Sequence, residues 1–213
     1  MNRMKLFAAI LVFGSFWGLS EVLIGSSLHN MGLPSGAIMS GIFALTILVL
    51  SRMIFRQTGM QLGIGFIAGA LRMFNPFIGC HLCSAIAIVA EGALFELIWY
   101  KLSFDSEYLE KPYMQASMGI ITAYVLFVGG HIVTQILTPI VAGATFYVQN
   151  LIVFMPRIIA GGLLPAITGG VVLPIITLSK NLDITLKDKV YYPTTLGISL
   201  ICWLLILGNF LLA

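Results

Sequence analysis

The sequence predicts an all-α integral membrane protein, folded as one bundle of transmembrane helices. Of its 213 residues, 59% are hydrophobic and only 9% are charged, and the mean hydropathy is +1.04. A soluble domain carries about 25% charged residues, so this chain lacks enough polar side chains to cover a surface in water. The apolar runs are about 20 residues long and do not alternate, which favours spanning helices over membrane strands of about 10 residues.

Seven apolar segments follow one another along the chain, in a single membrane domain that occupies residues 1–213. They are residues 5–27, 35–55, 58–77, 83–102, 113–138, 149–178 and 190–212. The first segment is longer than the apolar core of a secretory signal and contains Glu21, so we expect it to be retained as a helix. The sixth contains three prolines, which predict a kinked helix or a partly re-entrant segment.

The basic residues predict the orientation of the bundle. In a seven-span topology, nine of the 11 Lys and Arg residues fall on one side, namely Arg3, Lys5, Arg52, Arg56, Lys101, Lys111, Lys180, Lys187 and Lys189. The connections on the other side, residues 28–34, 78–82 and 139–148, contain no Lys or Arg. Cytoplasmic loops carry the excess of positive charge, so we expect a cytoplasmic N-terminus. Helical spans without the pattern of a barrel indicate a location in an inner or plasma membrane.

Five ionisable residues are left within the spans: Glu21, Arg72, Glu91, Glu96 and Arg157. At about 1.5 Å per helical residue, all except Glu96 fall at a similar depth in the outer half of the membrane. Ionisable groups at this depth normally face a partner or a wet cavity. Two interpretations remain open and can coexist: structural ion pairs between the carboxylates and the arginines, or a cavity in which these charges bind a polar ligand.

Polar residues near the outer ends of the spans extend this candidate site. His29 and His81 belong to outer connections, and His131 shares a helix face with Gln135. Asn75 adds further hydrogen-bonding capacity at the same level. The predicted ligand-binding residues are Glu21, His29, Arg72, Asn75, His81, Glu91, His131, Gln135 and Arg157.

The run Cys80-His81-Leu82-Cys83 admits several interpretations. A Cys-x-x-Cys pair at the outer end of a span could be redox-active, or could bind a metal together with His81. Alternatively, the cysteines are small buried residues or form a structural disulfide. We assign no resident cofactor from this run.

The chain lacks the motifs of soluble enzymes that bind nucleotides or hydrolyse peptides and esters, so we do not expect it to be an enzyme. Its glycine pairs indicate close helix packing. Gly65 and Gly69 are four residues apart, a spacing that suits helix docking either within the monomer or on a partner membrane subunit.

Two stretches resemble the substrate-binding S components of energy-coupling factor (ECF) transporters. In the first, "GMQLGIGFIAGALRMFNPF" is followed after an uncharged turn by "LCSAIAIVAEGALFELIWYKL", and the second is "LIVFMPRIIAGGLLPAITGGVVLPII" at 151–176. S components commonly have six helices, so the seven segments here would be six plus one. The resemblance implies capture of a vitamin-like ligand, and docking on a transmembrane coupling subunit that carries two cytoplasmic ATPases. Gly14 and Gly18 stand where the family has an Ala-xxx-Ala docking face.

The expected function is therefore substrate capture for an ECF-type importer, with no nucleic-acid partner and with lipid around the bundle. Arg72 and Arg157 would meet an anionic group of the ligand, and Glu21 and Glu91 would meet a cationic group or hold the arginines. Two alternatives belong to other classes. One is a membrane thiol or metal redox protein centred on Cys80 and Cys83, and the other is a self-contained ion-coupled transporter.

Overall fold

The computed structural model describes residues 3–75, 80–100, 109–178 and 188–212, and it confirms the prediction of an all-α membrane bundle. These residues are helical apart from short turns, and they contain no strand. Six of the helical stretches that they form are long and apolar enough to cross a membrane. We therefore describe the chain as a multi-pass membrane protein.

Each of the seven predicted segments contains helix. The first stretch is α1 (Arg3–Ser20), a π-helical segment η1 (Glu21–Gly25) and α2 (Ser26–Asn30), and the second is α3 (Ser35–Ile38), η2 (Met39–Ala44) and α4 (Leu45–Phe55). The remaining helices are α5 (Met60–Arg72), α6 (His81–Trp99), α7 (Pro112–Val141), α8 (Val148–Gly161), α9 (Leu163–Thr177) and α10 (Asp188–Leu212).

The third segment is shorter than the sequence predicts. Helix α5 has 13 residues, which is about 20 Å at 1.5 Å per residue, whereas the hydrocarbon core of a bilayer is about 30 Å thick. The chain leaves helical geometry after Arg72, and the end of the predicted segment, residues 76–77, lies outside the described residues. Helix α5 is therefore a short helix, and it packs mainly against α1 and α6.

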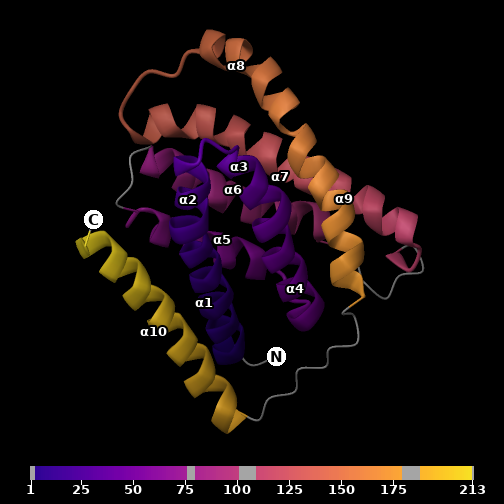
Figure 1. The fold of residues 1–213 in the computed structure, drawn as a ribbon, viewed down its shortest axis with the longest axis vertical. Coiled ribbons are helices and arrows are strands. Elements are labelled where there is room, and N and C mark those ends of the chain that lie inside the picture. The colour runs from indigo at the N-terminus through magenta and orange to yellow at the C-terminus, as the bar shows by residue number, and fades with distance from the viewer. Residues whose placement is uncertain (1–2, 76–79, 101–108, 179–187, 213) are drawn as a thin grey trace.

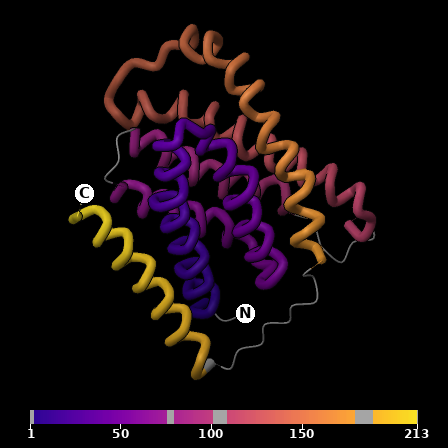
Figure 2. Tube along the Cα trace, viewed as in Figure 1, coloured from indigo at the N-terminus to yellow at the C-terminus, as the bar shows by residue number. Residues whose placement is uncertain are grey.

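The helices form a ring with one helix outside it. Helix α1 packs against α5, α5 against α6, α6 against α7 and α7 against α9, while η2 and α4 lie between α9 and α1. Helix α10 packs along the outer side of α1 (Figure 1). The tube view shows the same arrangement, with the two consecutive stretches of residues 3–55 side by side (Figure 2). Helices α6 and α7 of this ring, together with η1 and η2, line the first cavity described below.

The sixth segment is a kinked pair of helices. Helix α8 ends at Gly161 and α9 begins at Leu163, with Gly162 in a turn between them. Pro165 lies in the first turn of α9, where its missing N–H group costs no helical hydrogen bond. Figure 1 shows the chain changing direction between α8 and α9. Of the two predicted forms, the described residues adopt the kinked one.

The glycines predicted as a partner-docking face lie in helix crossings within the chain. Gly14 and Gly18 face α5, where a Cβ atom on Gly18 would be 2.7 Å from Leu71 Cβ. Gly65 and Gly69 face α6 at similarly short distances. All four glycines are buried. The prediction of a docking face at Gly14, Gly18, Gly65 and Gly69 is corrected accordingly: these small residues let helices of one chain approach closely.

Two charged residues, Arg52 and Glu96, form hydrogen bonds with unpaired backbone groups at helix ends. Arg52 donates hydrogen bonds to the carbonyl oxygens of Trp99 (3.0 Å) and Tyr100 (3.1 Å) at the end of α6. Glu96 accepts hydrogen bonds from the backbone N–H groups of Gly59 (2.8 Å) and Gln61 (3.2 Å) at the start of α5. The first N–H and last C=O groups of a helix lack partners within it, so both side chains serve the fold.

Candidate functional site

A cavity of about 360 Å³ lies between the first two helical stretches and helices α6 and α7. Two of its lining residues are the glutamates predicted as ligand-binding, so we call it the carboxylate cavity. Its lining comprises Glu21, Gly36, Met39, Ser40, Cys83, Ser84, Ala87, Ile88, Glu91, His131, Thr134, Gln135, Thr138 and Pro139. Four of the nine predicted site residues are in this set: Glu21, Glu91, His131 and Gln135.

Both π-helical segments contribute to this cavity. Glu21 is the first residue of η1, and Met39 and Ser40 are the first two residues of η2. A π-helical turn contains an extra residue, so it shifts the face on which the following side chains lie, and such turns are frequent at functional sites. The two segments thus direct one carboxylate and one hydroxyl into the same space from different helices.

Glu91 lies on the wall that α6 contributes. Its side chain is buried, and the Ser40 hydroxyl donates a hydrogen bond to Glu91 Oε1. Gly130 of α7 lies beside it, where a Cβ atom would be 3.3 Å from Glu91 Cγ. The neighbouring glycine and the serine hydroxyl therefore accommodate a carboxylate at a depth where burial of an ionised group is costly.

Glu21 has a different environment, because Arg72 interacts with it. Arg72 Nη1 donates a hydrogen bond to the Glu21 carbonyl oxygen (3.2 Å), and the guanidinium group interacts electrostatically with the Glu21 carboxylate. Trp17 Nε1 donates to Glu21 Oε1 (3.2 Å). Arg72 does not line the carboxylate cavity. The structure thus favours the structural interpretation for Arg72, and the expectation that it meets an anionic ligand group stays a prediction.

The ionisable side chains that line the carboxylate cavity are acidic apart from His131. Its described lining contains two carboxyl groups and no Lys or Arg, and Arg72 lies behind Glu21 without lining the cavity. The Thr138 hydroxyl oxygen is buried and has no hydrogen-bond partner among the described residues. A small cation with hydrogen-bonding groups would complement this lining.

His131 presents one ring nitrogen as an acceptor. Its Nδ1 atom lies 2.9 Å from the carbonyl oxygen of Phe127. A carbonyl oxygen can only accept, so the proton of this hydrogen bond is on Nδ1. In the neutral imidazole, Nε2 then carries the lone pair. The Phe127 and His131 rings are in contact, with centroids 4.2 Å apart.

A second cavity of about 580 Å³ adjoins the first, and we call it the arginine cavity. It contains two more of the predicted residues, His29 and Arg157. Its lining comprises His29, Leu33, Pro34, Ser35, Gly36, Ala37, Phe127, His131, Gln135, Phe154, Arg157, Ile158, Ala160, Gly161 and Leu164. Gly36, His131 and Gln135 line both cavities. The structure therefore brings six of the nine predicted residues to two adjoining spaces.

The other three predicted residues, Arg72, Asn75 and His81, line neither cavity. Asn75 is buried, and its Nδ2 atom donates a hydrogen bond to Ser26 Oγ (3.0 Å). His81 is the first residue of α6 and is half-buried. The expectation that Asn75 and His81 contact the ligand is therefore not supported by their positions.

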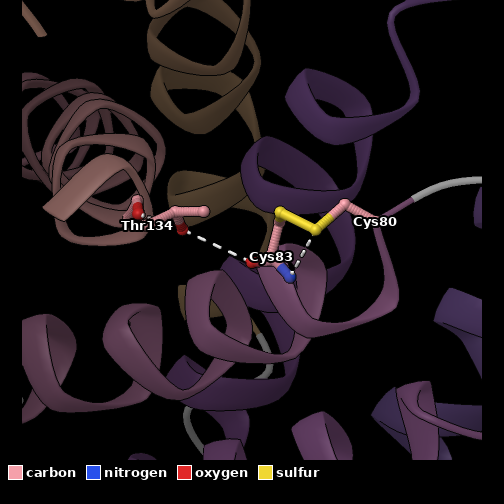
Figure 3. Close-up of a disulfide and its surroundings, with 4 residues drawn as sticks. Cys80, Cys83 and Thr134 are labelled. Carbon is pink, nitrogen blue, oxygen red and sulfur yellow. Dashed lines mark hydrogen bonds between the residues drawn. A yellow bond between two sulfur atoms is a disulfide. The ribbon is translucent and has the colours of Figure 1, made fainter. Parts of the chain in front are cut away.

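Cys80 and Cys83 form a disulfide beside the carboxylate cavity (Figure 3). The Cys83 N–H group donates to Cys80 Sγ (3.1 Å), which caps the start of α6, and Thr134 Oγ1 donates to the Cys83 carbonyl oxygen (3.4 Å). Sulfur atoms joined in a disulfide do not act as thiolate ligands. No group of three His, Cys, Asp or Glu residues in the described part of the chain could hold a metal ion. The metal interpretation of Cys80, His81 and Cys83 is corrected to a disulfide.

Sequence reasoning missed Ser40, the hydroxyl that binds Glu91, and it missed Thr134. Both are single polar residues within apolar spans, and Ser or Thr in such positions commonly bonds only to its own helix. Thr134 has such a bond, to the Gly130 carbonyl oxygen (2.7 Å), in addition to its longer bond to Cys83 of α6 (3.4 Å). No local pattern distinguishes Ser40 from Ser27, which bonds only to its own helix.

Comparison of this chain with protein-family models, with curated proteins and with solved structures finds no match. No family can be assigned from these comparisons.

Proposed function

We propose that this chain is the substrate-capture subunit of an importer of the ECF type, and that it binds a small solute in the carboxylate cavity. The observation that carries the proposal is the cavity itself, a space of about 360 Å³ with two carboxylates, an imidazole and several hydroxyls in its lining. Ligand sites are concave spaces with a few convergent polar groups.

Two features argue for binding in addition to packing. Ionisable residues within a membrane bundle are costly and usually mark a path or a site for a polar molecule. Glu91 is such a residue, and the cavity lining supplies no Lys or Arg for it among the described residues. A bundle that needed only mechanical stability would be served by apolar side chains at positions 40 and 91, because these pack without a desolvation penalty.

The importer proposal adds transport across the membrane to this binding role. With the N-terminus in the cytoplasm, both cavities would open toward the outer side, in agreement with the connections that lack Lys and Arg. The chain would receive its solute there, and movement against a transmembrane coupling subunit would release it inside. Two cytoplasmic ATPases would supply the energy, because this chain has no nucleotide-binding motif of its own.

The deciding experiment is purification in mild detergent, followed by mass spectrometry of small molecules released on denaturation. The proposal expects a compound in stoichiometric amount, and its loss in a Glu91→Gln variant. Exchange of Glu110, an exposed acid outside the two cavities, for Gln provides the matched control. A wild-type protein that retains nothing, even after incubation with a metabolite extract, would contradict solute capture.

A self-contained ion-coupled transporter is the second candidate, and the pair of carboxylates in one cavity favours it. Carboxylates in membrane bundles relay protons or bind coupling cations in such transporters. Reconstitution of the purified chain alone in liposomes separates the two functions. Solute uptake driven by an imposed ion gradient, with no other subunit present, would favour the ion-coupled transporter. Binding without uptake would favour the capture subunit.

A further inference from the structure

We propose that the carboxylate cavity and the arginine cavity form one two-part site for an amphoteric ligand. A cationic group, such as an amine, would bind beside Glu91, and a carboxylate or phosphate group of the same molecule would bind beside Arg157. This inference rests on the proposed solute capture, and it specifies the chemical class of the solute.

The two cavities share part of their lining. Gly36, His131 and Gln135 line both, so a single molecule that passes them would contact both spaces. A Cβ atom on Gly36 would be 3.8 Å from Phe127 Cε2 and 3.9 Å from His131 Cε1. The absence of a side chain at Gly36 therefore leaves room between α3 and α7 at the boundary.

The two cavities differ in the ionisable groups that they offer. The carboxylate cavity has Glu21 and Glu91 and no Lys or Arg in its described lining, whereas the arginine cavity has Arg157 and His29 and no acid in its described lining. Arg157 is exposed at this cavity, so it can reach an incoming anion before the ligand is fully inserted. Opposite charges placed in this way favour a molecule with two poles over one with a single sign of charge, because the wrong pole would be repelled.

The shared residues suit the middle of such a molecule. His131 presents Nε2 as an acceptor when neutral, because Nδ1 donates to the Phe127 carbonyl oxygen. Gln135 has both a donor and an acceptor in its amide. Together they can hydrogen-bond a neutral polar segment between the two charged poles, without adding a fixed charge at the boundary.

The experiment uses the purified full-length chain in detergent and a protein-free yeast extract as the probe. After incubation and washing, compounds released by denaturation are separated by mass spectrometry into amines, acids and molecules that carry both groups. The variants are Glu91→Gln and Arg157→Gln, with Glu110→Gln and Lys189→Gln as matched controls at exposed positions outside both cavities. Elution volume and thermal midpoint confirm that each variant is folded.

The proposal expects wild-type protein to retain compounds with both groups. Glu91→Gln and Arg157→Gln should each reduce retention about tenfold or more, the size of one charge-assisted hydrogen bond, and the controls should not. Retention of amines alone, unchanged by Arg157→Gln, would overturn the two-part site while leaving solute capture in place. Retention of no compound would overturn both proposals.

A steric pair of variants provides an independent test. Gly36→Ala would place its methyl group at ordinary contact distance from Phe127 and His131, so we expect retention to persist. Gly36→Leu would fill the boundary between the cavities and should remove retention of compounds with both groups. Equal retention by the two variants, when both are folded, would show that no ligand crosses this boundary.

Discussion

At the scale of single residues, the chemistry of the site depends on hydrogen bonds between helices. Ser40 of η2 reaches Glu91 of α6, and Arg72 of α5 reaches Glu21 of η1. Each carboxylate is thus supported by a residue about 50 positions away in the chain. The two carboxylates have different supports, a hydroxyl for Glu91 and a guanidinium group for Glu21, so they are not interchangeable in binding.

Removal of the Ser40 hydroxyl should destabilise the protein. In Ser40→Ala, Glu91 Oε1 loses its donor within a buried site, and leaving such a group unsatisfied costs about 1–3 kcal/mol. Thermal unfolding in detergent measures the change. Ser27→Ala is the control, because Ser27 is exposed and bonds only to its own helix. Equal midpoints for the two variants would show that the Ser40–Glu91 bond adds nothing to stability.

Two substitutions of His131 should separate its ring nitrogens. The Asn side chain can replace Nδ1 in the bond to Phe127, whereas the longer Gln side chain can place a polar atom near the position of Nε2. If Nε2 contacts the ligand, His131→Gln keeps more retention from the yeast extract than His131→Asn does, by about two- to tenfold for one neutral hydrogen bond. Higher retention by His131→Asn than by His131→Gln would assign His131 to its hydrogen bond with the Phe127 carbonyl oxygen.

At the scale of helices, small residues decide how closely the elements approach. The crossing of α5 and α6 is one such case, and it bears on the site because α6 carries Glu91. Gly92 follows Glu91 directly, and a Cβ atom there would be 2.6 Å from the Gln61 carbonyl oxygen. Backbone atoms on both sides leave no flexible side chain to move aside, so the position of α6 depends on this glycine.

Gly92→Ala should therefore destabilise the bundle, whereas Gly208→Ala should not. Overpacking of a tight contact costs about 1–3 kcal/mol, and the whole cost here falls on the α5–α6 crossing. At Gly208 of α10, an added methyl group would have no described atom within 4 Å outside its own helix. Loss of backbone freedom in the unfolded chain would favour alanine there by about 0.4–1 kcal/mol. Thermal unfolding in detergent compares the two variants, and comparable destabilisation by both would contradict the close approach of α5 to α6.

The start of α6 should contain no free thiol. Cys80 and Cys83 are joined, and Cys202 is a buried free cysteine. Alkylation of denatured protein without reductant should modify one cysteine per chain, and alkylation after reduction should modify three. Three modified cysteines without reductant would mean that the pair is a dithiol, and would argue against both the disulfide and the redox alternative.

At the scale of the whole molecule, the ring of helices places both cavities near one end. Figure 1 shows the turn between α2 and α3 at the same end as α8, with the N-terminus at the other end. His29 and Arg157 belong to α2 and α8, so the arginine cavity lies at that end. A capture subunit requires this end to face the outside.

Labelling of single cysteines tests this orientation. In a Cys202→Ala background with the native disulfide retained, Met31→Cys should react with a membrane-impermeant maleimide added to intact cells. Glu110→Cys should react only after the cells are opened. Both positions are exposed, so the difference reports the side of the membrane. The opposite pattern would place the cavities on the cytoplasmic side and exclude import by outer capture.

The sequence by itself determined the helical membrane class and the approximate position of each helical stretch. Composition and the length of apolar runs are local properties, and lipid permits few structures for such a chain. The sequence also indicated Glu21, Glu91, His131 and Gln135, because polar residues in apolar spans stand out without knowledge of their partners. These four residues line the carboxylate cavity.

Only the tertiary structure decided which of these groups meet. Arg72 supports Glu21 instead of lining a cavity, Ser40 supports Glu91, and Gly14 and Gly18 pack on α5. These outcomes depend on helix rotation, and the two π-helical segments change that rotation by their extra residue per turn. A helical pattern counted along the sequence assumes a constant rotation per residue, so the pairing of side chains across helices was not predictable from it.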